Sequence, residues 1–276
     1  MFIRDKAQVF FSLLSVFVVL GLYVLFLQKT QLDSLETVVP LSTEMKVMVN
    51  ECMISGLLSI IAMTTTLGAF GTYVNDLEAK KNVDLLTTEL PRASIQLSYL
   101  TSSSIIGFLL TFIAFLSGQL FLVFSGGSWL EWFDFVKVTG IIMLTVLLSS
   151  AMNLFIILFI KSQTAFATAS TIVGTLIGFL CGVYIPIGFL PDFVQKIILF
   201  FPVSHTTVLF RSVFMEDSLN DVFPTAELKE EFMRDFGVQY EWGGTIVEPW
   251  MSLAFISAAM LLFGLVSIIL FVKRNK

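Results

Sequence analysis

The sequence predicts an all-α integral membrane protein with six transmembrane helices, both termini in the cytoplasm, and a re-entrant helical hairpin between the fifth and sixth spans. Three observations predict this fold class. Hydrophobic residues make up 56% of the 276 residues and charged residues only 13%, about half the charged share of a soluble domain. Six long runs contain no charged residue. Lys and Arg concentrate in alternate loops, as they do in multi-pass proteins.

Each uncharged run is long enough to cross a membrane. A bilayer core about 30 Å thick needs about 20 apolar residues of helix, and the runs contain 19 to 28 residues. Arg4 and Lys6 precede the first run as in a secretory signal, but the run is too long for one and no small-residue cleavage site follows it, so we expect a retained span. The predicted spans are 9–27, 53–73, 97–124, 138–160, 165–185 and 250–272.

The loop charges orient these spans. With both termini inside, the inner segments hold nine Lys or Arg in 39 residues, whereas the outer segments hold seven in 102. Because basic residues mark the cytoplasmic side, both termini are predicted to be cytoplasmic. The protein itself is predicted to lie in the cell (cytoplasmic) membrane. The outer segments carry sixteen acidic residues. The inner segments are 1–8, 74–96, 161–164 and 273–276, and the outer ones are 28–52, 125–137 and 186–249.

The apolar stretch 186–214 is not predicted to be a seventh span. Its three prolines interrupt a helix, and Lys196 and Arg211 would lie at membrane depth. Only ten residues separate Pro191 from Pro202, which is about 15 Å of helix, or half a bilayer. We therefore expect two half-helices that dip in from the outer face around Pro202, buried in protein or lining a cavity.

The external segment 215–248 is the one sizeable aqueous part of the sequence. Thr225 is a candidate cap for a short amphipathic helix that runs to Phe236 and ends at Gly237. Leu228, Phe232 and Phe236 share one face of this helix. The helix is either a lid packed on the rest of the chain or a surface for a partner.

The sequence lacks the residues of most catalytic chemistry. There is no phosphate-binding G-x-x-x-x-G-K-[ST] loop, and a single histidine excludes His-based metal clusters, so we predict no catalytic residue, metal or cofactor on this chain. A net charge of −5 argues against a nucleic-acid partner, and Cys52 and Cys181 are expected to be packing residues. Ion-coupled carriers keep charged residues in their spans. Because none is present here, the energy for any uphill transport must come from a partner.

Two segments are candidates for helix packing and docking. Small residues recur every four positions in the fifth span and allow close helix approach, either in a dimer or along a translocation path, or within the chain: Ser170, Gly174, Gly178 and Gly182. The inner loop 74–96 alternates charges with leucines, which suits either a helix set into a partner's groove or a solvated linker. Its charged residues are Asp76, Glu78, Lys80, Lys81, Asp84, Glu89 and Arg92, and Leu85, Leu86 and Leu90 lie between them.

Two regions resemble a known family, the membrane permeases of type-2 ABC transporters, which are mostly exporters. The first resembles the family's signature after its fifth span and consists of Tyr184-Ile185-Pro186-Ile187-Gly188-Phe189-Leu190-Pro191, Val194-Gln195, Phe201-Pro202-Val203-Ser204-His205 and Leu209-Phe210-Arg211. Asp84-Leu85-Leu86-Thr87-Thr88 with Arg92 resembles the region that contacts the ATPase. The resemblance extends from residue 4 to residue 272.

The resemblance implies partners and site residues. Permeases of this family pair as homodimers or heterodimers and work with two ATPase subunits, which bind ATP and Mg²⁺, so this chain would be a transport subunit and not an enzyme. The loop 74–96, including Pro91, would dock on the ATPase. The half-helices would gate the outer end of the path, with His205 and Arg211 either lining the gate or snorkelling to the interface. The gate residues would be Tyr184, Pro186, Gly188, Pro191, Pro202, Ser204, His205 and Arg211.

The sequence departs from the family pattern in two places. The family has a proline where Glu89 stands, and Pro91 comes two residues later, so the docking helix is expected to end differently. Only eight residues precede the first span, where many relatives have an amphipathic helix on the inner membrane surface. Either this member lacks that helix or the chain start is incomplete.

The leading functional hypothesis is the permease subunit of an ATP-driven exporter. The uncharged, Phe-rich spans suit an amphipathic or lipid-like cargo, such as a drug, a peptide antibiotic or a lipid-linked glycan, and lipid is the expected surrounding. The alternative is a non-transporting membrane sensor or immunity-type scaffold that binds its partner through 215–248. A passive channel or ion-coupled carrier is disfavoured by the uncharged spans.

Overall fold

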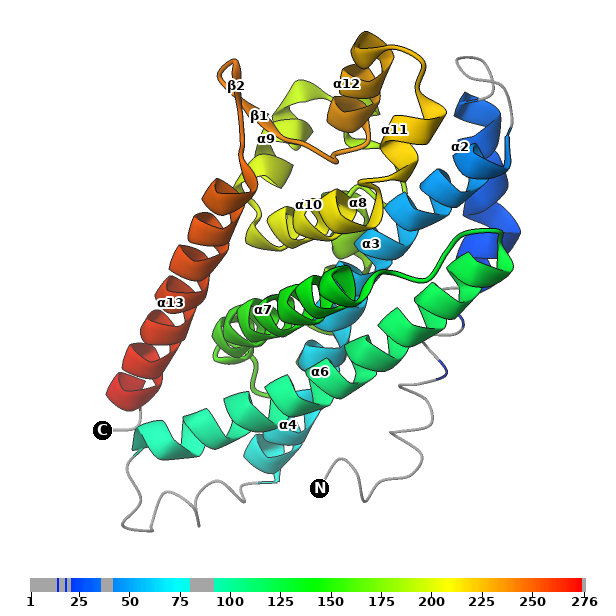
Figure 1. Cartoon of the computed structure of the whole chain (residues 1–276). Coiled ribbons are helices and arrows are strands. Elements are labelled where there is room, and N and C mark those ends of the chain that lie inside the picture. The colour runs from blue at the N-terminus through cyan, green and yellow to red at the C-terminus, as the bar shows by residue number, and fades with distance from the viewer. Residues whose placement is uncertain (1–13, 15–17, 19–20, 36–41, 80–91, 275–276) are drawn as a thin grey trace.

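The computed structural model describes residues 14, 18, 21–35, 42–79 and 92–274, most of them in helices (Figure 1). The only strands among these residues form a two-residue antiparallel pair. The elements in chain order are η2 (Tyr23–Leu27), α2 (Gln28–Leu35), α3 (Thr43–Ala69), α4 (Gly71–Glu78), α6 (Arg92–Phe124), α7 (Trp132–Ile157), α8 (Gln163–Leu180), η3 (Ile187–Phe189), α9 (Asp192–Phe200), α10 (Pro202–Phe214), α11 (Ser218–Val222), α12 (Ala226–Asp235), β1 (Glu241–Trp242), β2 (Thr245–Ile246) and α13 (Pro249–Arg274).

The fold class predicted from the sequence, an all-α integral membrane protein, is confirmed. Five helices in the described part of the chain are long and apolar enough to cross a membrane, and the bent pair α9–α10 makes six if it counts as one span. The first predicted span, 9–27, lies mostly outside the described residues. Its last five residues form the π-helix η2.

The second membrane helix begins earlier than the uncharged run predicts. α3 starts at Thr43, ten residues before the predicted boundary, and the Ser42 hydroxyl caps it by accepting a hydrogen bond from the Met45 backbone N–H at 3.1 Å. α4 continues in the same direction as far as Glu78. The helix therefore includes charged residues such as Glu51, which the predicted span did not include because it was defined as an uncharged run.

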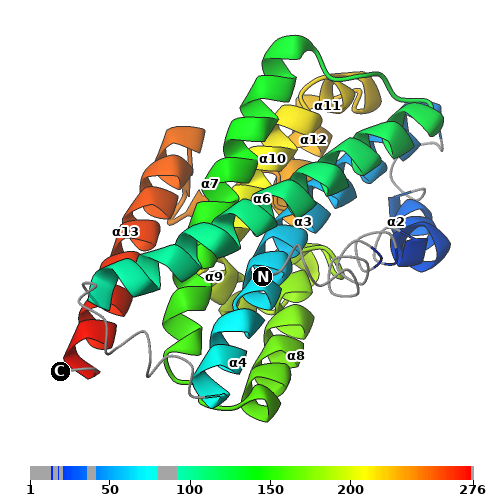
Figure 2. The ribbon, with the colours of Figure 1, turned by 90° about the horizontal axis from the view of Figure 1, so that it is seen from below.

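α3 is the central helix of the fold. It packs against α6, α7, α8 and α10, which Figure 2 shows around it, and twenty of its 27 residues are buried. Hydrogen bonds between polar side chains add to this packing. The Asn153 side-chain amide of α7 donates to the Thr66 hydroxyl and to the Met63 carbonyl oxygen, both at 2.9 Å, and the Ser59 hydroxyl is 3.0 Å from that of Thr206 in α10. Such bonds help to hold membrane helices together, because an apolar helix surface contacts lipid tails as favourably as it contacts another helix.

Two helices at the periphery expose apolar faces. Only Ile177 and Gly178 of α8 are buried, and Ile172 and Leu176 are more than half exposed. α13 packs on α6, α7 and α10 but exposes Leu261, Leu262 and Leu265. In a membrane protein, such faces contact lipid or another membrane subunit.

The two ends of the molecule differ. η3, α9, α11, α12 and the β-hairpin gather at one end, whereas the end of α4, the start of α6 and the end of α13 lie at the other (Figure 1). α12 occupies the position of the predicted external helix, although Thr225 precedes it without a side-chain capping bond. Phe232 of α12 and Phe236, which directly follows this helix, are buried in the main apolar core. α12 therefore packs on the rest of the chain.

Candidate functional site

The segment 186–214 folds as short helices separated by its prolines. α9 and α10 meet at an angle of 86°, with Phe201 in an extended conformation between them. Pro202 is the first residue of α10, where the missing N–H costs nothing. Pro186 and Pro191 directly precede η3 and α9. Each proline thus stands where a helix begins.

Side chains of α10 bind the carbonyl groups that the bend releases. A helix leaves its last carbonyl oxygens without intrahelical partners. At the end of α9, the side chains of Ser204 and His205 supply the missing hydrogen-bond partners. The Ser204 hydroxyl lies 2.6 Å from the Ile198 carbonyl oxygen and 2.7 Å from that of Phe201. The His205 Nε2 lies 2.8 Å from the Leu199 carbonyl oxygen. The backbone carbonyl oxygens at the sharp bend are therefore hydrogen-bonded by side chains of the same chain.

His205 also joins α10 to α13. A carbonyl oxygen can only accept, so Nε2 carries the proton and, in the neutral ring, Nδ1 accepts from the Ser252 hydroxyl at 3.0 Å. The ring packs against Tyr240 and Phe255, with centroids 5.2 and 4.8 Å away. Because His205 is only 4% exposed, the snorkelling alternative does not fit it.

Arg211 is the most unusual residue of this segment, since it is fully buried with 0% exposure. All five hydrogen bonds that its guanidinium donates go to backbone carbonyl oxygens. Nη1 binds Phe236 at 2.7 Å and Gly237 at 3.2 Å, Nη2 binds Gly182 at 3.1 Å and Cys181 at 3.3 Å, and Nε binds Cys52 at 3.3 Å. Arg211 therefore holds α3 and the ends of α8 and α12 to α10.

The acceptors are helix ends, which suits a cation. Gly182 and Gly237 follow α8 and α12 with φ of +59° and +62°, the left-handed conformation that commonly terminates helices. The carbonyl groups there carry the negative end of the helix dipole, which favours a nearby positive charge. The planar guanidinium can reach both helix ends at once. The snorkelling alternative does not fit Arg211 either, because its guanidinium binds backbone carbonyl oxygens inside the fold.

Tyr184 and Gly188 pack against other parts of the chain. The Tyr184 ring lies directly against Gly178, so closely that a β-carbon at position 178 would overlap it. A β-carbon at Gly188 would lie 2.5 Å from the Asp235 Oδ1 and 2.8 Å from its Cα, so η3 can approach α12 only with glycine there. Burial raises the pKa of the Asp235 carboxyl above its usual range.

The small residues of the fifth span have different surroundings. Gly178 receives Tyr184, and Gly182 ends the helix and binds Arg211. No atom of the described residues lies within 4 Å of a β-carbon placed at Gly174, and the Ser170 hydroxyl has no hydrogen-bond partner among them. Packing within the chain thus explains Gly178 and Gly182, whereas the surface at Gly174 is open.

Most of the predicted ATPase-docking residues lie outside the described residues: Lys80, Lys81, Asp84, Leu85, Leu86, Glu89 and Pro91. Asp76 is buried at 9% exposure and accepts a hydrogen bond from the Tyr99 hydroxyl at 3.0 Å. The Glu78 carboxylate accepts one from the Gln163 backbone N–H at 3.3 Å. These two residues tie α4 to α6 and α8, and Arg92 begins α6.

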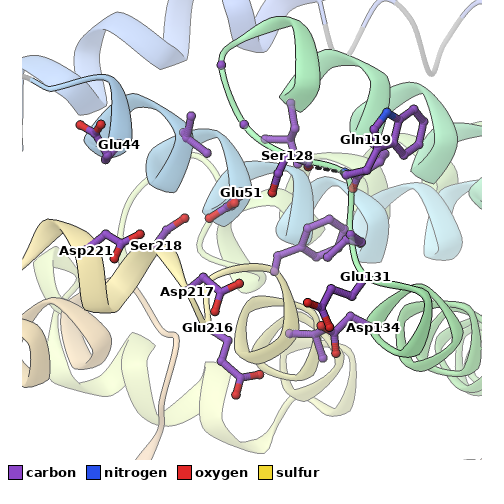
Figure 3. Close-up of a pocket in the computed structure, with 18 of the residues that line it drawn as sticks. Glu44, Glu51, Gln119, Ser128, Glu131, Asp134, Glu216, Asp217, Ser218 and Asp221 are labelled. Carbon is purple, nitrogen blue, oxygen red and sulfur yellow. Dashed lines mark hydrogen bonds between the residues drawn. The ribbon is translucent and has the colours of Figure 1, made fainter.

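Sequence reasoning missed an acidic cavity of about 810 Å³ between the start of α3, the connection from α6 to α7, and the end of α10 (Figure 3). Trp129, Phe133 and Leu130 form part of its wall, and Lys137 is its one basic residue. Lys137 bonds Asp134 at 2.7 Å. Seven carboxylates line the cavity: Glu44, Glu51, Glu131, Asp134, Glu216, Asp217 and Asp221.

The acidic excess of the outer segments was a partial signal for this cavity. It could not show that acids from three separate segments converge, because that depends on the helix packing. Within the described residues, no three His, Cys, Asp or Glu side chains are arranged to hold a metal ion. The cavity is therefore acidic without being a metal site of that kind.

Comparison with known proteins identifies the family. A sequence model described as ABC-2 type transporter matches residues 1–215, which include α3 to α10 and the whole segment around Arg211. No curated protein matches the chain significantly. Permeases of this family work with ABC ATPase subunits. The chain, a multi-pass helical membrane protein, belongs to the ABC-2 type transporter family and is the permease component of an ABC transporter.

Proposed function

We propose that this permease exports an amphipathic or lipid-like cargo across the cell membrane, driven by ATP that a separate subunit hydrolyses. The termini and the loop 74–96 are cytoplasmic, 186–214 is a re-entrant outer gate, and 215–248 is external. The distribution of basic residues supports this orientation. The fold supports it too, since α12 and the ends of α4 and α13 lie at opposite ends of the molecule (Figure 1).

The observation that carries this proposal is the direct attachment of α10 to the central helix. Arg211 binds the Cys52 carbonyl oxygen of α3, and Thr206 contacts Ser59 one to two turns further along. α3 then continues into α4, whose last residues are the first of the loop 74–96. A displacement of that loop by an ATPase would reach the outer gate along one nearly continuous helical element.

A second permease subunit, a copy of this chain or a paralogue, completes the transport path in this proposal. The open surface of α8 at Gly174 supports its involvement, because small residues at membrane-helix interfaces allow close approach. The gate itself includes Ser204, His205 and Arg211, whose bonds hold α9, α13 and the ends of α8 and α12 around the bend. Opening would move this group as a unit.

Purification with the cellular partners tests the proposal. The tagged permease should co-purify with an ATP-hydrolysing subunit, and Asp84→Ala and Arg92→Ala should each lower the ATPase activity that cargo stimulates. Glu227→Ala, on the exposed face of α12, is the matched control and should leave that activity unchanged. An intact complex without an ATPase, or coupling variants with full stimulation, would contradict the docking role.

The same preparation tests the scaffold alternative. A partner that binds the external segment would contact the exposed face of α12, so Glu227→Lys with Glu230→Lys should abolish its capture. Deleting 225–236 is a poor test, because the Phe236 carbonyl oxygen binds Arg211 and the deletion would disturb the core. Under the exporter proposal, the charge-reversed variant keeps its ATPase partner and its stimulated hydrolysis.

A further inference from the structure

The acidic cavity has a large unbalanced negative charge. Among the described residues, seven carboxylates and one lysine line it, and only Asp134 is paired with that lysine. Glu131, Glu216 and Asp217 are exposed, whereas Glu51, which belongs to α3, is half-buried (Figure 3). Like charges that converge in a cavity with protein walls attract cations and repel anions.

The cavity also has an apolar wall. Trp129 and Phe133 are 56% and 69% exposed beside the acids, and Leu122 and Val47 line the interior. Aromatic faces attract cations and also cover apolar groups. A volume of about 810 Å³ lies in the range of pockets that hold drug-sized molecules.

Two buried oxygen atoms of the lining have no hydrogen-bond partner among the described residues. Gln119 is 1% exposed, and its Nε2 donates to the Ser128 carbonyl oxygen at 3.0 Å (Figure 3), but its Oε1 has no partner. The Glu51 Oε2 is buried without a partner as well. Buried polar atoms are normally paired. The Gln119 Oε1 is an amide oxygen that can only accept, so a ligand that satisfies it must bring an N–H or O–H donor.

From these observations we propose that the cavity binds an amphipathic organic cation, a molecule with an ammonium or guanidinium head and an apolar body. The head lies among Glu51, Asp217 and Gln119, and the body lies against Trp129 and Phe133. The same charges disfavour a phosphate-bearing lipid-linked glycan in this cavity. The role of such a cation as cargo rests on the proposed export function, whereas its binding is a property of this chain alone.

Equilibrium binding to the full-length permease in nanodiscs of neutral lipid tests the site. The probe is dansylcadaverine, which combines one primary ammonium with an apolar fluorophore, and its matched control is the same molecule with the amine acetylated. Fluorescence is measured against empty nanodiscs, without ATP or an ATPase. We expect saturable binding of the amine, binding at least fivefold weaker for the acetylated probe, and a Kd that rises with NaCl because salt screens exposed charges.

Variants locate the binding. Glu51→Gln with Asp217→Asn should raise the Kd of the amine at least about fivefold, the effect of one lost charge at close range even in water. Glu131→Gln with Glu216→Gln, at exposed positions, should also raise the Kd of the amine. Glu227→Gln with Glu230→Gln removes two acids from exposed α12 and should leave the Kd unchanged.

The outcomes separate this site from the proposed function. Equal affinity for both probes, no saturable binding of the amine, or a Kd that the cavity variants do not change would overturn the site. If instead the amine binds as expected but does not stimulate the ATPase of the complex, the site stands and its assignment as a cargo site fails. Failure of the ATPase to co-purify would overturn the export function without affecting the binding result.

Discussion

Replacing Arg211 with lysine keeps the buried positive charge but removes the shape that binds two helix ends. The guanidinium reaches Phe236 and Gly237 with one nitrogen and Cys181 and Gly182 with another. The single nitrogen of lysine can occupy only one of these two positions. Arg211→Lys therefore leaves one helix end without its donor, along with the bond to α3.

The cost follows from the bonds that are lost. A hydrogen bond with a charged partner contributes about 1.5–3 kcal/mol, and lysine loses at least three of the five bonds, the two to one helix end and the one to α3. Part of this loss is recovered by relaxation and by water, so we expect the free energy of unfolding to fall by about 3 kcal/mol. For a domain of this size, that corresponds to a decrease in Tm of about 6–12 °C.

The two cysteines provide the assay. Cys52 and Cys181 are 2% and 0% exposed, they are the only cysteines of the chain, and their own carbonyl oxygens bind Arg211. A fluorogenic maleimide added to the detergent-solubilised permease therefore reports the opening of the protein around Arg211. Arg211→Lys should be labelled at a lower temperature, and faster at a fixed temperature, than the wild-type protein.

The control is Arg234→Lys, because Arg234 is exposed on α12. This variant should have the labelling profile of the wild-type protein. If Arg211→Lys also had the wild-type profile, the carbonyl network would not hold these helices together, and the assignment of Arg211 as their common anchor would be wrong.

Three further predictions use the same stability measurement. Gly178→Ala should lower the Tm, because overpacking against a ring costs about 1–3 kcal/mol, whereas Gly174→Ala, facing open space, should leave it unchanged; equal effects would contradict the packing described. Asn153→Leu should cost about 0.6–1.7 kcal/mol, the range for hydrogen bonds between membrane helices, and a larger loss would indicate a further role. Burial raises the pKa of the Asp235 carboxyl above 3.8, so the wild-type protein should lose stability as the pH rises through the pKa of the folded state. In thermal scans from about pH 4 to pH 7, Asp235→Asn should remove this loss. If the variant had the same dependence of Tm on pH as the wild-type protein, the burial effect would be refuted.

The membrane helices were largely predictable from the sequence, because charge is so costly in lipid that its absence marks a span. The same criterion misplaced the start of α3. Glu44 and Glu51 belong to that helix, but they line the acidic cavity and so do not contact lipid. A rule based on the absence of charge cannot recognise a membrane helix whose end borders an open cavity.

The surroundings of Arg211 were not predictable. Its acceptors come from residues 25 to 159 positions away, and they are backbone carbonyl groups, which every residue possesses. A carboxylate partner would at least have left a candidate in the sequence. Gly237 was predicted to end the external helix, but Gly182 was assigned to packing within the fifth span, so the sequence did not show that both glycines end helices that meet the same side chain.

The self-contained bend between α9 and α10 has a mechanical consequence. Because Ser204 and His205 bind the carbonyl groups released at the bend, straightening it would break these bonds, and the two helices are expected to tilt as one rigid bracket. The last residues of α10 and the two acids that follow, Glu216 and Asp217, form one wall of the acidic cavity. A tilt of the bracket would therefore change the width of the cavity, so that occupancy of the cavity and the position of the helix bend are expected to depend on each other.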